Sequence, residues 1–259
     1  MRVWFYRFYE KRMPFFFYLH HVILQTLTLE TKLQQSAISF HAVVLFDAGK
    51  DKLLLMDFTV SNPQLTDEIV SDTYLFTQYI NNKIEQSGAR YGIGGYAEHR
   101  TIYSRSKVFD ATNLFTEPRR LHLGIDIWGE PATPVFAPLG GVVHSYAFND
   151  KPGDYGTTII LLHQLNGSVF YTLYGHLSLR NLAGLEAGKY ISLGEPIGTF
   201  GEPFENGNWP PHLHFQIIKN MDGSWGDYPG VCAFSEREKY LQNSPDPDLI
   251  LNMMQYAVK

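Results

Sequence analysis

Two apolar runs open the ordered-looking part of the chain after residue 36. The runs 40–46 and 53–60 are rich in β-branched, aliphatic and aromatic residues, and the polar stretch 47–51 separates them. Such runs around a short turn predict two strands joined as a β-hairpin. Residues 36–100 are therefore expected to begin with a β unit.

A helix is predicted after this hairpin. Thr66 precedes two acidic residues, which suits a helix start because carboxylates near the N-terminus interact favourably with the helix dipole. Apolar residues then recur at near-helical spacing, and Gly88 is the expected end. The glycine-rich stretch 92–95 is expected to be a flexible link. Together these elements make residues 36–100 a small α+β segment.

Short β-rich runs dominate from about residue 101. Glycines and prolines separate the runs, and Asn166 followed by Gly167 is the strongest hairpin signal. Many short strands without a long helix predict a mainly β fold, with an antiparallel sheet arranged as a barrel or sandwich. The predicted strands are 141–147, 157–163, 168–174, 190–193, 197–200 and 212–218.

These patterns divide the chain into four parts. We expect a leader of uncertain order at 1–35, the α+β segment at 36–100, a β domain at 101–225 and a C-terminal extension at 226–259. Near its end, the extension contains a run, 249–256, that suits a short helix.

Composition and charge restrict the class of function. The chain of 259 residues has a formal net charge of -5, which argues against a nucleic-acid-binding surface because such a surface needs clustered Lys and Arg. Cys232 is the only cysteine, so neither an internal disulfide nor a cysteine metal cage is possible. Histidine, aspartate and glutamate are therefore the protein ligands left for a zinc site.

The N-terminus carries a weak resemblance to an export signal. An apolar run at 15–19 follows a basic stretch, but Pro14 and two histidines interrupt it, and no small-residue cleavage site follows. The run is shorter than the roughly 20 residues of a membrane-spanning helix, so no membrane span is expected. The compartment stays open: cell envelope or secreted if the signal is real, otherwise cytoplasmic.

Four histidines and one aspartate carry the candidate chemistry. His122 and Asp126 form a first patch, His176 a second, and His212 with His214 a third. Imidazole and carboxylate groups bind tetrahedral Zn²⁺, and two histidines with one carboxylate leave a fourth position for water. Two further histidines then remain for proton transfer and for stabilising developing charge. The set predicts a hydrolytic rather than a structural metal site.

The spacing of the residues within each patch indicates how their side chains can be arranged. His212 and His214 lie in a predicted strand, so their side chains share one face, about 6.5 to 7 Å apart by strand rise. One of them can bind a metal while the other faces the water or the substrate. His122 and Asp126 would lie roughly 13 Å apart in a straight strand, too far to bind one ion. The chain must bend between them, and Gly124 permits the bend.

Taken together and in this order, the three patches resemble the lysostaphin/LytM-type zinc metallopeptidases, which cut peptides of bacterial peptidoglycan. That family has an H-x-x-x-D motif, a later single histidine and a final H-x-H, and the resemblance extends over 119–218. The residues around the motifs agree with it as well. They are Gly124, Pro134, Val135, Ala137, Pro138, Gly140, Gly141, Tyr174, Gly175, Leu177, Ser178, Gly188 and Gly194.

The resemblance implies a role for each site residue. It makes His122, Asp126 and His214 the zinc ligands of a metallopeptidase domain at 101–225. It makes His212 and His176 the catalytic pair beside the activated water. We favour His212 as the general base and His176 as the group that stabilises the tetrahedral intermediate, and the two roles are interchangeable at this stage. The expected cofactor is Zn²⁺, and the expected partner is peptidoglycan or a related peptide.

The residues around the motifs most resemble a subgroup fused to kinase-like and aminotransferase domains, and proteins of that subgroup need not act on peptidoglycan. Two alternatives to the peptidoglycan peptidase also stay open. One alternative is a non-catalytic binding or regulatory module of the same fold. The other is a zinc hydrolase of a small-molecule amide. The enzyme is favoured because all five site residues are present. The sequence contains no H-E-x-x-H motif for a glutamate-based mechanism and no lysine hairpin of a biotinyl or lipoyl carrier.

Other polar residues near the motifs carry weaker predictions. His144 and His163 are expected to be structural or exposed. Asp154 and Tyr155 belong either to a substrate-facing loop or, as the favoured alternative, to a solvated turn. Trp209 is expected at the rim of the groove, either in contact with substrate or packed over the mouth of the β domain.

Overall fold

The computed structural model describes residues 27–113 and 115–259. Most of the predicted leader lies outside the described residues, and so does the apolar run with its weak export signal. The described part begins with helix α2 (Leu29–Ser36), which Thr28 caps by accepting a hydrogen bond from the Thr31 amide. Among the described helices, none is long and apolar enough to cross a membrane.

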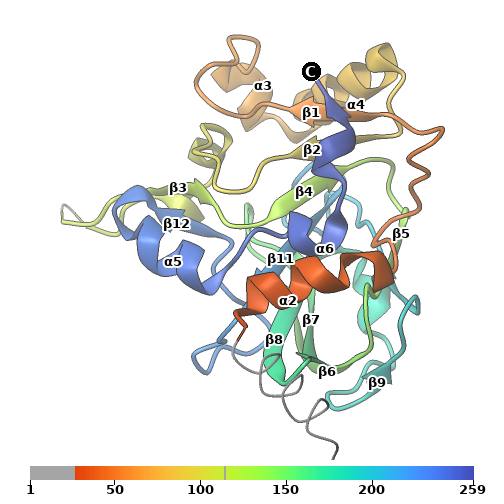
Figure 1. The fold of residues 1–259 in the computed structure, drawn as a ribbon. Coiled ribbons are helices and arrows are strands. Elements are labelled where there is room, and N and C mark those ends of the chain that lie inside the picture. Colours follow the sequence, from red (N-terminus) through yellow and green to blue (C-terminus); the bar gives the residue numbers. More distant parts are fainter. Residues whose placement is uncertain (1–26, 114) are drawn as a thin grey trace, which may run out of the picture.

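A nine-stranded sheet forms the centre of the fold (Figure 1). Its strand order is β13-β1-β2-β4-β11-β8-β7-β6-β9. Neighbours are antiparallel from β2 to β9, whereas β1 pairs in parallel with both β2 and β13. The strands are β1 (Leu53–Met56), β2 (Tyr91–Gly94), β4 (Ile125–Trp128), β6 (Gly141–Asn149), β7 (Gly156–Leu165), β8 (Ser168–Leu177), β9 (Tyr190–Ile191), β11 (His212–Ile218) and β13 (Ala257–Val258).

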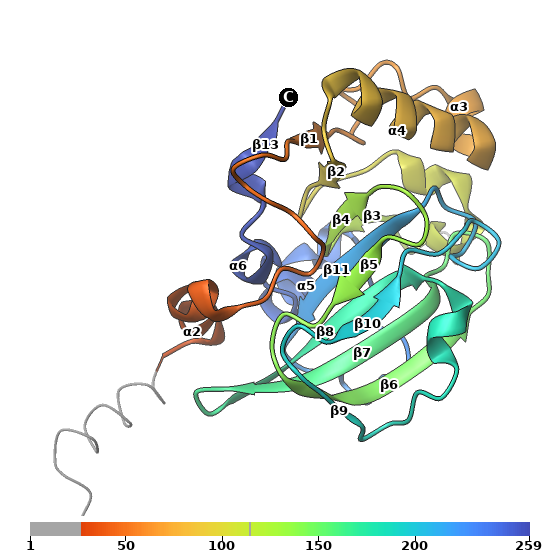
Figure 2. The same ribbon diagram turned by 90° about the vertical axis from the view of Figure 1, so that its right-hand side faces the viewer.

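Two small sheets accompany the large one. They pair β5 with β10 and β3 with β12. Apolar side chains from β5, β10, β6, β7 and β11 belong to one core cluster. The sheet of β5 and β10 therefore packs face to face on the large sheet (Figure 2). The additional strands are β3 (Arg119–His122), β5 (Pro134–Phe136), β10 (Pro196–Thr199) and β12 (Val231–Ala233).

The mainly β fold class is confirmed, with one correction to its form. Each of the six predicted runs contains a strand, and Asn166 and Gly167 adopt the left-handed φ values, 47° and 78°, of a two-residue hairpin turn. The large sheet is mixed rather than wholly antiparallel, because β1 pairs in parallel with both β2 and β13. Over the described residues it ends at β13 and β9, so it does not close into a barrel.

Strand β11 carries two kinds of side chain. Leu213 and Phe215 are fully buried in the main core cluster. His212 and His214 project from the other face, because successive residues of a strand point to opposite sides. The prediction that His212 and His214 lie on one face of a strand is confirmed.

The predicted hairpin at 40–60 is wrong. Only the second run contains a strand, β1, and it pairs in parallel with β2 rather than with the first run. Val43 and Val44 of the first run are buried in the main core cluster. Their segment runs beside β5, where the Phe136 amide donates to the Val43 carbonyl. Burial against a large core stabilises these residues more than an isolated two-stranded hairpin would.

The predicted helix is present but broken into two. Thr66 caps α3 (Asp67–Ser71), and Gly88 ends α4 (Thr73–Ser87) with a left-handed φ of 65°, as expected. Between them, Asp72 leaves the helical conformation and its Oδ1 accepts hydrogen bonds from two amides at the start of α4. This second N-cap restarts the helix in a new direction.

The glycine-rich stretch 92–95 is not a flexible link. Gly92 and Gly94 lie in β2, a buried strand between β1 and β4. A Cβ atom at Gly92 would lie 2.9 Å from Met56 Cγ and 3.3 Å from Trp128 Cβ. These glycines therefore allow close packing across the sheet, and residues 36–100 extend the same sheet that carries the candidate site.

Short helices complete the C-terminal extension. The run predicted at 249–256 forms one helical turn and one 3₁₀ turn, separated by Asn252 in the left-handed conformation. The helices of this part are α5 (Arg237–Asn243) and α6 (Asp248–Leu251). Short 3₁₀ helices span Ala37–Ser39, Ile102–Arg105, Lys107–Phe109, Leu179–Leu182, Phe234–Glu236 and Met254–Tyr256.

Candidate metal centre and active site

Three candidate ligands meet at one point in the structure. His122 ends β3, Asp126 lies on β4 and His214 lies on β11, and one donor atom of each lies within 4.8 Å of the others. His122 Nε2 lies 2.9 Å from His214 Nδ1. Asp126 Oδ1 lies 3.2 Å from His122 Nε2 and 3.0 Å from His214 Nδ1. All three side chains are buried, so the fold presents two imidazoles and one carboxylate to a single point.

Strand pairing and one bend bring these residues together. His214 faces Asp126 in the antiparallel register of β11 and β4. Gly124 lies between β3 and β4, where the predicted bend occurs. A Cβ atom at Gly124 would lie 2.5 Å from His214 Cε1 and 2.8 Å from the Phe215 carbonyl oxygen. Its φ is not left-handed, so glycine is required here mainly to leave room for the His214 ring.

Hydrogen bonds on the far sides of the two imidazoles orient their lone pairs. His122 Nδ1 donates to the Gly95 carbonyl at 3.1 Å. His214 Nε2 donates to Gln216 Oε1 at 2.9 Å, because Gln216 Nε2 points to the Pro229 carbonyl, which can only accept. The two facing nitrogens are therefore acceptors beside a carboxylate. Such a group of acceptors requires a cation, and its composition fits Zn²⁺.

Burial and neighbouring charges set the protonation states of this group. Burial, together with the Arg100 charge, lowers the pKa of His122 to about 4. Burial alone would raise the pKa of Asp126, but the charged Arg100 guanidinium, which donates to Asp126 Oδ2, holds that pKa well below its ordinary value. Near neutral pH the histidine is neutral and the aspartate is ionised, which are the forms that bind a metal.

His176 and His212 form a second pair beside this group. Their ring centroids lie 4.1 Å apart, and both side chains are buried. His176 Nδ1 donates to the Asn206 carbonyl and His212 Nδ1 to the Pro210 carbonyl, each at 2.7 Å. Each ring therefore keeps Nε2 as an acceptor. Burial lowers the pKa of His212 to about 4 and the pKa of His176 well below its usual value, so both rings are neutral near pH 7.

The backbone of His176 adopts a conformation that is rare for a residue with a side chain. Its φ is 62°, in the left-handed region. Two hydrogen bonds hold it there: its amide donates to the Tyr155 carbonyl and its carbonyl accepts from the Gly201 amide, each at 2.9 Å. Conformations of this kind cluster at functional sites, where the surrounding structure enforces them.

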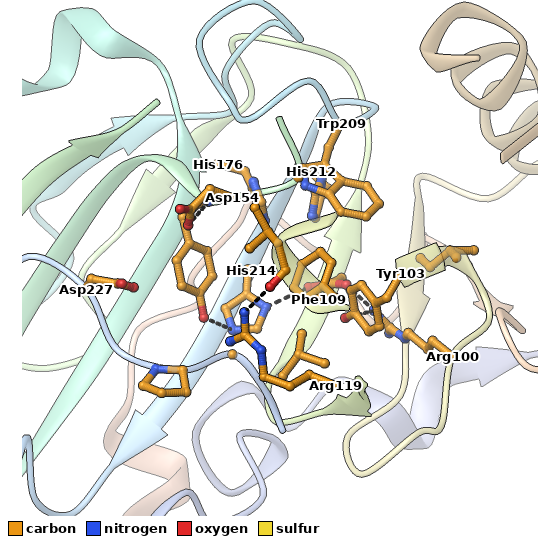
Figure 3. Close-up of a pocket in the computed structure, with 18 of the residues that line it drawn as sticks. Arg100, Tyr103, Phe109, Arg119, Asp154, His176, Trp209, His212, His214 and Asp227 are labelled. Atoms are coloured by element: carbon orange, nitrogen blue, oxygen red, sulfur yellow. Dashed lines mark hydrogen bonds and ion pairs between the residues drawn. The ribbon is translucent and has the colours of Figure 1, made fainter. Parts of the chain in front are cut away.

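One cavity joins the two groups of residues (Figure 3). It has a volume of about 130 Å³, and Asp126, His176, His212 and His214 line it. In the view of Figure 3, Asp154 and Asp227 lie on one side of His214 and Arg100 on the other. The remaining labelled residues around the cavity are Tyr103, Phe109, Arg119 and Trp209. The arrangement can hold a metal ion and place a small polar group beside two neutral histidines.

The weaker sequence predictions have mixed outcomes. Tyr155 is buried with its hydroxyl 3.3 Å from His214 Nε2, so it faces the site and does not lie in the solvated turn that was favoured. Trp209 is buried and packs against Tyr103 and Phe109 in the cavity wall. His163 is structural, as expected in one of its two alternatives, and it is buried rather than exposed.

Several residues of the site escaped sequence reasoning. Arg100 and Tyr103 lie more than twenty positions before Asp126, outside every motif, and only the fold brings them to it. Arg119 is the first residue of the region 119–218 that resembles the family, and Asp227 lies beyond the end of that region. Gln216 alone had a usable signal, since it follows His214 by two positions in a strand and therefore shares its face.

The part of the chain that contains the candidate site is similar to a known peptidase family. The model of peptidase family M23 matches residues 120–224. An L-Ala--D-Glu endopeptidase of Bacillus subtilis is 31% identical over 150 residues, which cover 54% of this chain and 43% of that protein. The peptidoglycan DD-endopeptidase ShyC of Vibrio cholerae is 26% identical over 145 residues, which cover 52% of this chain and 31% of that protein. The chain thus spans less than half the length of either curated relative.

The chain is also similar to a solved structure. The catalytic domain of lysostaphin from Staphylococcus simulans is 20% identical, with a TM-score of 0.35 over 64% of this chain and 98% of that one. The family model covers all five candidate site residues, from His122 to His214. The similarity to peptidase family M23 thus lies in residues 120–224, and the curated relatives named as endopeptidases are similar over about half of this chain.

Proposed function

We propose that this protein is a zinc-dependent metalloendopeptidase that hydrolyses peptide bonds of peptidoglycan or a related peptide. One observation carries the proposal: three metal-binding side chains converge on one point, and two of them, Asp126 and His214, line the same cavity as two neutral histidines. The match to peptidase family M23 and the similarity to two proteins named as endopeptidases support it.

His122, Asp126 and His214 are the proposed zinc ligands. When bound, zinc would lower the pKa of a water molecule and polarise the carbonyl to be cleaved. The Gly95 carbonyl and the Gln216 side chain hold the two imidazoles in the tautomers that expose a lone pair to the ion. Three protein ligands would leave a fourth position on the zinc ion for water or substrate.

His212 is the proposed general base, and His176 is proposed to stabilise the developing oxyanion. In the tautomers of the structure both Nε2 atoms are acceptors, so either ring can take the proton of the water. The ring that takes it becomes a donor, and it can then stabilise negative charge or return the proton to the leaving amine. The close pairing of His176 with His212, with ring centroids 4.1 Å apart, supports assigning both roles to this pair.

The surrounding chain contributes to the proposed peptidase domain at 101–225. Residues 36–100 extend its sheet through β2, and residues 227–231 of the C-terminal extension line the cavity. Zinc as cofactor and peptidoglycan as partner follow from the proposed reaction. The similarity to a subgroup fused to kinase-like and aminotransferase domains, and the cellular compartment, stay predictions.

A second candidate function is hydrolysis of a small-molecule amide at the same centre. The exposed fractions of His176, His212 and His214 are 6%, 2% and 3%, and the cavity measures about 130 Å³. An extended peptide needs a long groove, so a cavity of this volume with such little-exposed histidines favours a small substrate. The segment that carries Tyr103 and Phe109 forms part of its wall.

Bound zinc and muropeptide release from purified peptidoglycan test the proposal. His214→Ala is expected to lose zinc, whereas His212→Ala is expected to keep zinc and lose turnover. His144→Ala is the matched control, because His144 is half-buried and outside the cavity, and both readouts should stay at the wild-type level. A wild-type protein that binds no zinc refutes the proposal. Zinc binding with cleavage of short amides but no muropeptide release favours the second candidate.

A further inference from the structure

A fully buried arginine lies directly behind the candidate metal centre. The exposed fraction of Arg100 is 0%. Its Nη1 atom lies 2.5 Å from Asp126 Oδ2, and its Nε atom lies 2.6 Å from Glu98 Oε2. Exposed ion pairs contribute little to stability, but a buried charge that loses its partner is costly. The three charged groups therefore form one unit at the back of the site.

The fold provides a space that the Arg100 guanidinium fills. β2 pairs with β4 so that Gly94 lies opposite Asp126. A Cβ atom at Gly94 would lie 2.8 Å from Arg100 Nη2, so glycine leaves the space that the guanidinium fills. The Phe58 ring lies 5.3 Å from Arg100 Cζ, and the Arg100 amide donates to the Arg120 carbonyl at 2.9 Å. The backbone and two neighbouring strands thus fix the direction of the side chain.

The two oxygens of Asp126 consequently have different surroundings. Oδ2 accepts from Arg100. Oδ1 lies 3.2 Å from His122 Nε2 and 3.0 Å from His214 Nδ1. Only one carboxylate oxygen is therefore directed at the point where the three donors meet, while the other is held by a planar, rigid donor.

We infer that Arg100 is a positioning residue that occupies one oxygen of Asp126, so that the carboxylate offers a single oxygen to the metal. The inference rests on the proposed function, because it requires a metal ion at this site. A carboxylate that bound through both oxygens would compete for the position that an open site reserves for water. Glu98 holds Arg100 from the side away from Asp126 and keeps its guanidinium in place.

Zinc affinity and the visible absorption of the cobalt-substituted protein test the inference. Affinity is measured by competition with a chromophoric chelator. Arg100→Gln is expected to lose zinc affinity by about 10- to 100-fold, as when other groups that orient a ligand are removed. Its cobalt absorption is expected to weaken, because a carboxylate freed from Arg100 binds through two oxygens and raises the coordination number.

Two further variants sharpen the test. Gly94→Ala keeps Arg100 but places a methyl group against Nη2, so it is expected to shift both readouts in the same direction. Arg105→Gln is the matched control, because its guanidinium is half-buried, donates to Thr73 and packs on Trp209 without contacting any of the three ligands. Both readouts should stay at the wild-type level in this control.

An unchanged affinity and an unchanged cobalt spectrum in Arg100→Gln would overturn the inference and leave only a structural ion pair. If that variant does not fold, Gly94→Ala and Glu98→Gln decide, and wild-type spectra in both overturn it. Neither readout depends on cleavage. Zinc binding that depends on Arg100 without muropeptide release supports the inference and contradicts the proposed substrate, whereas a wild-type protein without zinc overturns both.

Discussion

His163 gives the fold a pH dependence that follows from its burial in the sheet. Its ring is 1% exposed, Nδ1 donates to the Gly140 carbonyl at 3.0 Å, and Nε2 lies 2.7 Å from Thr172 Oγ1. Burial lowers the pKa of His163 from 6.5 to about 4. The folded protein therefore holds the neutral ring at a pH at which the unfolded chain already binds a proton.

The direction and size of the effect follow from this difference. Because the unfolded chain binds the proton more tightly, the free energy of unfolding decreases as the pH falls from about 6.5 towards 4. Each pKa unit corresponds to about 1.4 kcal/mol, so the full effect is about 3 kcal/mol. Between pH 7 and pH 5, about 2 kcal/mol of stability is expected to be lost through this one residue.

Urea unfolding at pH 7 and pH 5, in the presence of a chelator, measures this loss. His163→Gln keeps polar groups at the same place but does not titrate in this range. The variant is expected to be less stable than the wild type at pH 7 and to lose about 2 kcal/mol less on acidification. The other buried histidines are the same in both proteins and cancel in the comparison. Equal losses in the two proteins would refute the assigned role of His163.

Two other substitutions probe the metal centre. Gln216→Leu removes the acceptor for His214 Nε2 and is expected to lower zinc affinity about 10-fold or more in chelator competition. Gln216→Glu, which retains an acceptor, is its control, and equal affinities of the Leu and Glu variants would contradict the reasoning. Gly124→Ala is expected to lose bound zinc by metal analysis, because its Cβ would displace the His214 ring. A full complement of zinc in that variant would show that the bend tolerates a side chain.

Local patterns in the sequence predict a large part of the β region. The runs that became β6, β7, β8 and β11 are rich in β-branched, aliphatic and aromatic residues, and the Asn166-Gly167 turn has few alternative conformations. The histidine patches were also identifiable, because residues two apart on a strand share a face whatever its neighbours are. These features depend on short stretches of chain and not on the tertiary fold.

Features that depend on long-range pairing could not be predicted. The apolar run at 40–46 specifies that its residues will be buried but not which partner will cover them. Gly92 and Gly94 have the composition of a link, and only the neighbouring Met56 and Arg100 side chains explain why small residues are needed there. The contact between Arg100 and Asp126 exists because β2 pairs with β4, a choice that neither strand encodes alone.

The position of β2 in the sheet affects how the candidate domain can be isolated. β4, which carries Asp126, is hydrogen-bonded to β2 on one side and to β11 on the other. A fragment that starts at residue 101 would remove β2 and turn β4 into an edge strand with unpaired backbone groups. Exposed edges of this kind promote association between chains. A fragment cut to the limits of the family match would therefore be prone to aggregate, and its inactivity would say little about the chemistry of the intact site.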